Sequence, residues 1–259
     1  MDFDYCIKDK EISFWYANGS SLMSGDEFHS FHEILYIFRA EGSFLSEKEK
    51  AQLSPDTLIL IPKETYHNFI FAKDSDYVRC RIWFDDIAHF GDVVRECMSG
   101  IRVISEVGET LAKLFSELSE ISKIDLPNIE KRLLLRSSVL RILFEIKNSR
   151  PGNPNMQIQN ELVRNAAAII EKSYRDDISV PKIAARLFVS PSQLSHTFKK
   201  ELNISIYKYI TLKRLICVQK LIKSGIKASD AARQCGFCDY SSFYRVYKNH
   251  YGVPPFRTK

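Results

Sequence analysis

The 259-residue sequence lacks the features of membrane, secreted and disordered proteins. It has no run of about 18 apolar residues, so we expect no membrane-spanning segment. Its first ten residues, MDFDYCIKDK, have neither the basic nor the apolar part of a signal peptide, and we expect a protein of the reducing cytoplasm. Only 10 glycines and 9 prolines occur, which excludes collagen-like and low-complexity chains. With 45% hydrophobic residues, the chain is long enough for two small domains or one large one, each with a hydrophobic core.

The six cysteines do not have the spacing of a metal site. Cys235 and Cys238 form one C-x-x-C pair, but neither a second pair nor an H-x-H lies nearby to complete a zinc site. A redox pair usually follows a strand, whereas this one spans Gly-Phe between helical segments. We therefore interpret the pair as a coincidence in a turn. The other four cysteines are isolated among apolar residues and are expected to be small core residues: Cys6, Cys80, Cys97 and Cys217.

The net charge is negative in the first part of the chain and positive in the last. Residues 158–259 contain 18 Lys and Arg against 7 Asp and Glu, whereas residues 1–157 contain 19 basic and 25 acidic residues. The sign of the net charge changes at the turn-forming segment NSRPGNPN, so we place a linker at 149–157. This distribution predicts a basic domain for a polyanion, joined to a separate domain.

The first hundred residues have the pattern of β-strands. Short apolar runs occupy 34–38 and 58–61, and apolar and polar residues alternate from 76 to 84, as in a strand with two unlike faces. Breaks such as Asn18-Gly19 separate these segments. The pattern predicts a small antiparallel barrel or sandwich over residues 1–100.

Residues 101–148 have a helical period instead. One apolar stripe runs through 107–121, and Pro127 is placed to open the next helix. Apolar residues at 129–146 cover more than one side of a helix. Either this helix packs only against its own barrel and neighbouring helices, or part of it contacts a second copy of the chain.

The basic segment begins with two short helices in the order of a helix-turn-helix. Ser179 precedes a helix at 180–187, and Ser190-Pro191 is a typical start for a second helix at 191–201. The turn between them is three to four residues long.

This arrangement occurs twice. The segment LSHTFK at 194–199 returns as FYRVYK at 243–248, 49 residues later, after the N-cap residue Asp239. A long amphipathic helix at 206–223 lies between the two copies, and Ser224-Gly225 ends it.

The polar side chains opposite the buried positions of the second helix in each copy are suited to a major groove. Arg245 can bond a guanine with two hydrogen bonds, whereas lysines more often bind phosphates. For a single helix, the alternative is that the polar face is only a solvated surface. Two such helices in a basic domain favour DNA binding. The candidate DNA-binding residues on these faces are Ser192, Ser195, His196, Lys199, Ser241, Tyr244, Arg245 and Lys248.

The last hundred residues resemble the DNA-binding domain of the AraC/XylS family of bacterial transcription regulators. The matching segments are IAARLFVSPSQLSHTFKKELNIS, YITLKRLICVQKLI and AARQCGFCDYSSFYRVYKNHYGVPPFR. The resemblance implies two helices that enter successive major-groove segments, and it places Tyr240 and Ser242 among the base-contacting positions. Because the first of these helices carries only short polar groups and a His, we expect it to be the less specific one.

The N-terminal half is similar, more loosely, to the cupin-like sensor domain of that family. The similarity rests on HSFHE at 29–33, Glu41-Gly42 and the segment LIPKETYH at 60–67. It implies a barrel that holds a small molecule and helices that form a dimer. Candidate ligand-binding residues are His32, His67, Arg79, Arg81 and Trp83.

A metal-dependent cupin enzyme is the rival hypothesis, with His29, His32 and His67 as ligands. His29 and His32 would face opposite sides of a straight strand, and Tyr36 stands where such a site would have Glu, four residues after His32. We therefore expect structural histidines, no metal, no cofactor and no enzyme activity.

The sequence thus predicts an α+β multidomain protein. A cupin-like barrel (1–100), a helical segment (101–148) and a linker (149–157) precede an all-α domain with two helix-turn-helix motifs (158–259). We expect a cytoplasmic, nucleoid-associated homodimer that binds double-stranded promoter DNA, an effector and, by resemblance, RNA polymerase. A barrel that only dimerises, without an effector, remains the alternative.

Overall fold

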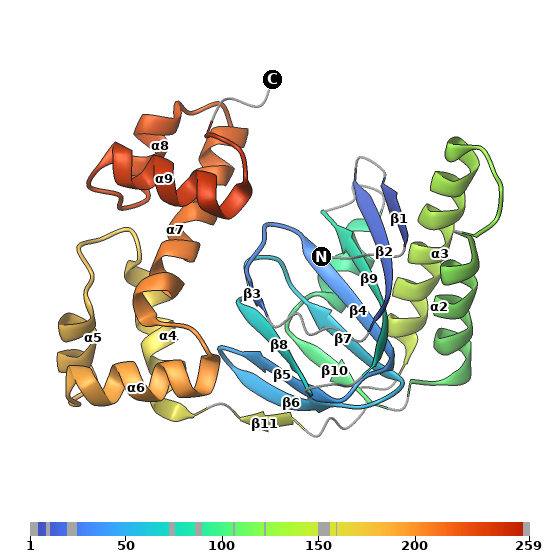
Figure 1. The fold of residues 1–259 in the computed structure, drawn as a ribbon, viewed down its shortest axis with the longest axis horizontal. Coiled ribbons are helices and arrows are strands. Elements are labelled where there is room, and N and C mark those ends of the chain that lie inside the picture. The colour runs from blue at the N-terminus through green and yellow to red at the C-terminus, as the bar shows by residue number, and fades with distance from the viewer. Residues whose placement is uncertain are drawn as a thin grey trace. The chain divides into compact units, whose positions relative to one another are not determined.

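The computed structural model describes residues 5–8, 11–19, 25–72, 76–85, 90–105, 107–121, 123–149, 156–158 and 160–255. They form two units, which are described separately (Figure 1). The first contains two β-sheets and helices α1–α3, and the second contains helices α4–α9. No described helix is both long and apolar enough to cross a membrane.

The first unit contains short strands in two sheets. A six-stranded sheet has the order β1-β2-β9-β4-β7-β10, and a five-stranded sheet has the order β11-β6-β5-β8-β3. The expected strands are present, but the described ones form two sheets and not a closed barrel. Their bounds are β1 (Tyr5–Lys8), β2 (Ile12–Gly19), β3 (Gly25–Glu27), β4 (His32–Arg39), β5 (Gly42–Ser46), β6 (Glu49–Leu53), β7 (Thr57–Ile61), β8 (His67–Phe71), β9 (Tyr77–Phe84), β10 (Arg102–Ile104) and β11 (Met156–Ile158).

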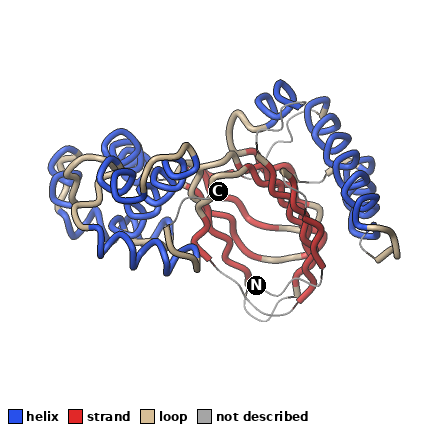
Figure 2. The backbone as a smooth tube through the Cα atoms, turned by 90° about the horizontal axis from the view of Figure 1, so that it is seen from above, coloured by secondary structure: helices blue, strands red, loops and turns tan. Residues whose placement is uncertain are grey.

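The six-stranded sheet is buried on both faces, as β4 shows. Ile34 and Tyr36 belong to a core shared with the helices, whereas Leu35 and Ile37 belong to a core shared with the second sheet. Successive side chains of a strand point to opposite faces, so this strand has an almost continuous apolar run. The helices that cover the outer face are seen beside the strands in Figure 2.

The alternation in β9 identifies which of its sides faces the second sheet. Cys80 and Ile82 lie in the core on the helix side, and Tyr77 lies in the core on the sheet side. Arg79 and Arg81, which alternate with Cys80 and Ile82, therefore point toward the second sheet, where both are buried.

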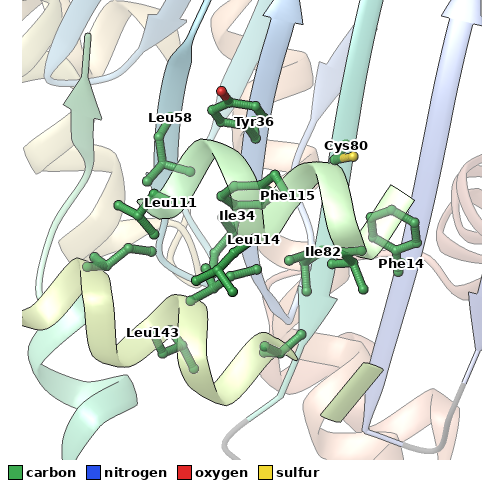
Figure 3. Close-up of a cluster of buried hydrophobic side chains, with 14 of the residues drawn as sticks. Phe14, Ile34, Tyr36, Leu58, Cys80, Ile82, Leu111, Leu114, Phe115 and Leu143 are labelled. Atoms are coloured by element: carbon green, nitrogen blue, oxygen red, sulfur yellow. The ribbon is translucent and has the colours of Figure 1, made fainter. Parts of the chain in front are cut away.

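Three helices cover the first sheet: α1 (Gly91–Cys97), α2 (Glu109–Ile121) and α3 (Asn128–Asn148). Figure 3 shows how α2 and α3 pack on it. The Phe115 ring of α2 stacks on the Tyr36 ring with centroids 4.5 Å apart, and the Tyr36 hydroxyl donates a hydrogen bond to Asp56 Oδ1 at 2.8 Å. Burial and this bond to Asp56 raise the pKa of Tyr36. Pro127 is the N-cap residue of α3, one position before the predicted one.

The second unit consists of α4 (Glu161–Ser173), α5 (Val180–Arg186), α6 (Pro191–Leu202), α7 (Ile206–Lys223), α8 (Ala228–Gln234) and α9 (Tyr240–Tyr251). The N-caps predicted at Ser190 and Asp239 are confirmed, because each side chain accepts a backbone N–H of the helix that follows. Ser179 is at the N-cap of α5, but its side chain makes no capping bond.

The structure corrects three of the cysteine assignments. Cys6 is exposed and not in the core. Cys217 is not isolated, since it forms a disulfide with Cys235, so Cys235 is not simply half of a chance pair with Cys238. Cys80 and Cys97 are buried as expected.

We predict that Phe115→Ala lowers the free energy of unfolding of the first unit by about 3 to 5 kcal/mol, because it empties a buried site and removes the ring stack. Ile124→Ala is the control: its side chain is 48% exposed, and its removal should cost less than about 1 kcal/mol. Denaturant unfolding followed by circular dichroism measures both. Equal losses in the two variants would contradict the assignment of Phe115 to the core.

Candidate nucleic-acid interface and buried charged cluster

In both helix-turn-helix units of the second domain, the first helix ends with the same kind of backbone hydrogen bond. In the first unit the Val189 N–H donates to the Ala184 carbonyl at 3.1 Å. In the second unit the Phe237 N–H donates to the Ala232 carbonyl at 3.0 Å. Each bond spans five residues, as in the common C-terminal motif in which the residue before the donor is left-handed. The repeat seen in the sequence is therefore also a repeat of backbone geometry.

The left-handed residue differs between the units. It is Phe188 in the first, with φ 55°, and Gly236 in the second, with φ 89°. A Cβ on Gly236 would lie 2.6 Å from the Arg175 carbonyl oxygen and 2.9 Å from Arg214 Nε of α7. Glycine is therefore required there for two reasons, its backbone conformation and the close approach of neighbouring atoms. Phe188 has no such neighbour requirement, and its side chain is 95% exposed.

The first recognition helix, α6, is held by two buried side chains and exposes a polar face. Leu194 and Phe198 are fully buried, and the Phe198 ring lies 5.4 Å from the Tyr209 ring of α7. The predicted DNA-binding residues of α6 are all exposed: Ser192, Ser195, His196 and Lys199.

The second recognition helix, α9, is held in the same way by Phe243 and Tyr247. The Arg245 guanidinium is exposed and lies 3.4 Å from Ser242 Oγ. Hydrogen bonds from the Ser242 side chain and from backbone N–H groups lower the pKa of Asp239 at the N-cap, so this carboxylate stays charged. The other predicted residues of α9 are exposed, except for the half-buried Tyr244: Tyr240, Ser241, Ser242 and Lys248.

Sequence comparison of the two units missed a difference of one residue. The helices α5 and α8 are 48 residues apart, as their N-caps Ser179 and Lys227 show, whereas the N-caps of α6 and α9 are 49 apart. The second turn is therefore one residue longer than the first. The hydrogen bonds and caps at the two turns reveal this extra residue, whereas the repeated apolar pattern of α6 and α9 does not.

The first domain contains a buried group of charged residues. Glu33 is fully buried and lies 2.7 Å from Arg81 Nε and 3.3 Å from His67 Nε2. His67 Nδ1 is 3.1 Å from the Thr65 carbonyl oxygen, which can only accept, so Nδ1 carries a hydrogen. These ion pairs offset the large cost of burying Glu33 and Arg81.

The structure brings together only some of the predicted ligand-binding residues. His67 and Arg81 meet through Glu33, and the Trp83 ring lies beside Arg81. Arg79 is placed elsewhere, over the rings of Phe71 and Tyr77. His32 is also apart: its Nδ1 accepts the Lys63 N–H at 3.1 Å. Glu33 itself was missed, although a carboxylate within the apolar run HEILYIF indicates a buried ion pair.

The predicted histidine trio is also divided. His67 contacts Glu33, whereas His32 accepts the Lys63 N–H, so these two predicted ligands do not share a site. His29 is grouped with the second unit. Because Arg81 already pairs with Glu33, its positive charge competes with a cation there.

Comparison with known proteins finds a family match for most of the second domain. Residues 183–259 match the family described as a helix-turn-helix domain. Over 234 residues the chain is 23% identical to the probable transcriptional regulator LumQ of Photobacterium leiognathi, which covers 88% of this chain and 89% of that protein. It is 24% identical over 239 residues to the arabinose operon regulatory protein of Salmonella typhimurium (strain LT2), over 84% and 79% of the two chains. Among solved structures, ToxT from Vibrio cholerae is similar with a TM-score of 0.39 and 11% identity, over 95% and 97% of the chains.

The Gly236 site yields a stability prediction with a matched control. Gly236→Ala should lower the free energy of unfolding of the second domain by roughly twice as much as Gly225→Ala, or more. Both residues have a positive φ, which costs an alanine about 1 kcal/mol. Only at Gly236 does a Cβ also meet neighbouring atoms, since nothing lies within 4 Å of one at Gly225. Denaturant unfolding of the full chain measures both, and equal losses would show that the close approach is not important.

Proposed function

We propose that this chain, whose C-terminal domain is a helix-turn-helix domain of the AraC type and whose relatives are transcriptional regulators, binds promoter DNA with α6 and α9. The observation that carries the proposal is the duplicated unit. Each copy has a short, capped helix whose buried residues leave a polar face in solvent. One such face could be an ordinary solvated surface, whereas two in a domain with 18 basic and 7 acidic residues fit a duplex.

The length of α7 supports a fixed separation between the two units. It has 18 residues and so spans about 27 Å. Successive major-groove segments on one side of a duplex are about 34 Å apart. Because α7 connects α6 to α8, a protomer can place one recognition helix in each of two neighbouring segments.

The two recognition helices differ in what they can recognise. Arg245 has the planar set of donors that suits the O6 and N7 atoms of guanine, so α9 supplies most of the base discrimination. The short hydroxyl side chains of α6 offer fewer discriminating contacts. Lys199 and Lys248 bind phosphates, which gives affinity without sequence preference.

A second copy of the chain is the proposed partner of the first unit. The apolar residues Ile129, Leu133, Leu140 and Phe144 of α3 follow one another at spacings of four, seven and four, and each is between 38% and 61% exposed. Such spacing forms a single stripe along a helix, as in a helical dimer seam. This stripe supports the homodimer predicted from the sequence.

The first unit is proposed to be the regulatory half. The Glu33–Arg81–His67 group lies in a part of the fold that faces the second sheet, and its pairing offsets the cost of burying charge there. The Arg81 guanidinium carries five N–H donors and can donate hydrogen bonds to a small polar effector. By resemblance to the family, the protein acts as an activator that contacts RNA polymerase.

DNA binding is tested with two variants and a control. Duplexes selected from random DNA by the full chain provide the operator. Arg245→Ala should lose about 1 to 3 kcal/mol on the operator and discriminate less well between base pairs. Lys199→Ala should weaken binding to operator and random duplex alike and reduce the salt slope by about one. Lys172→Ala, an exposed lysine of α4, should change neither. Equal effects of the Arg245 and Lys199 variants on both duplexes would contradict these roles.

The dimer is tested by changing the stripe on α3. Leu133→Asp should convert the protein to a monomer in sedimentation velocity, because a charge in an apolar seam is strongly unfavourable. Leu134→Asp makes the same change one residue away, about 100° round the helix, and should leave the dimer intact. A wild-type protein that is monomeric at high micromolar concentration would reject the dimer.

A further inference from the structure

The cross-link between Cys217 and Cys235 joins the connecting helix α7 to the end of α8. The two residues are 18 apart in sequence, their Cα atoms are 6.0 Å apart, and both are buried. This Cα separation is within the usual range for bridged cysteines. Because the sequence predicts a reducing compartment, where lasting disulfides are rare, such a pair is expected to change its state with the redox conditions.

The cross-link lies at the turn that positions the second recognition helix. The Cys235 N–H donates to the Ala231 carbonyl at 3.0 Å, and Cys235 is the C-cap of α8. The next residue is the left-handed Gly236, which approaches Arg214 of α7. Arg214 and Cys217 are three residues apart and so lie on one side of α7. The turn therefore meets α7 at two successive points, one of them covalent.

The same turn contains a third cysteine, which is accessible. Cys238 is exposed and directly precedes Asp239, the N-cap of α9. Thiol–disulfide exchange requires a thiolate that a small disulfide can reach, and the buried pair is shielded from solvent. Cys238 can react first and pass the oxidation to Cys235 through the C-x-x-C spacing.

We propose that Cys217 and Cys235 form a reversible thiol–disulfide switch that controls DNA binding by α9, and that Cys238 is its entry point. This proposal rests on the proposed function. With a small-molecule disulfide such as oxidised glutathione, the Cys238 thiolate attacks one sulfur and releases one glutathione thiol. Cys235 then attacks Cys238 and releases the second, and Cys217 attacks Cys235 and returns Cys238 as a thiol. Overall, two protein thiols become one disulfide and one oxidised glutathione becomes two thiols.

The oxidised state is the one that binds DNA more tightly. The cross-link holds the turn against α7, and α9 begins only five residues after Cys235. In the reduced state the turn keeps only its non-covalent contacts, so α9 must be ordered when it docks. Ordering α9 on binding costs conformational entropy, and a cross-link that holds α9 in place beforehand lowers this cost.

The experiment uses the full chain equilibrated with oxidised or reduced glutathione. Alkylation and mass spectrometry of peptides identify the cross-link, and fluorescence anisotropy measures affinity for the selected operator and a random duplex. The oxidised wild type should contain the Cys217–Cys235 cross-link and bind the operator at least about fivefold more tightly than the reduced form. Cys217→Ala should bind with the weaker affinity in both buffers. Cys80→Ala removes a buried thiol of the first unit and should behave as the wild type. Cys238→Ser should reach the same cross-linked state more slowly.

Several outcomes would overturn the switch. These are the absence of the Cys217–Cys235 peptide in oxidised glutathione, equal operator affinity in the two buffers, or loss of the difference in Cys80→Ala. An unchanged rate of cross-linking in Cys238→Ser would refute its role as the entry point. Equal operator affinity in both states, with the operator still preferred over the random duplex, rejects the switch and leaves the proposed function standing. No preference in either state rejects both.

Discussion

The close packing of the Gly236 turn against α7 is the contact on which the DNA-binding domain depends. The turn leaves no room for a side chain, since the Arg175 carbonyl and Arg214 Nε occupy the space. Arg214 Nε in turn donates to the Tyr174 carbonyl at 2.6 Å, which ties the end of α4 to α7. One guanidinium thus ties the end of α4 to α7, and the turn before α9 packs closely beside it.

Much of the second domain could be predicted because its signals are local. The bounds of α7 agree with the predicted 206–223, and the caps Ser190 and Asp239 agree as well, since capping and helix ends depend on residues within one turn. The Cys217–Cys235 pair could not be predicted, because 18 residues separate its members and their proximity results from tertiary packing. The candidate DNA-binding residues other than the half-buried Tyr244 are exposed as expected, and their roles stay predictions.

The first domain was less predictable, because its structure depends on contacts between residues that are distant in the sequence. Strands were recognised from alternation and apolar runs, but whether strands close into a barrel depends on pairing between distant segments. The partner of Glu33 could not be inferred, because Arg81 is 48 positions away and four arginine or histidine candidates were available. Once β4 and β9 are paired, with Glu33 opposite Trp83 and Leu35 opposite Arg81, the ion pair follows from their shared face.

The extra residue in the second turn makes the two halves of the DNA-binding domain non-interchangeable. The short helices before the turn superimpose at an offset of 48 residues, and the longer ones after it at 49. A chimera that grafts the α9 residues onto α6 by aligning the first helices would rotate every grafted side chain by about 100°. Transplanting the specificity of one half into the other therefore requires moving the connecting turn together with its helix.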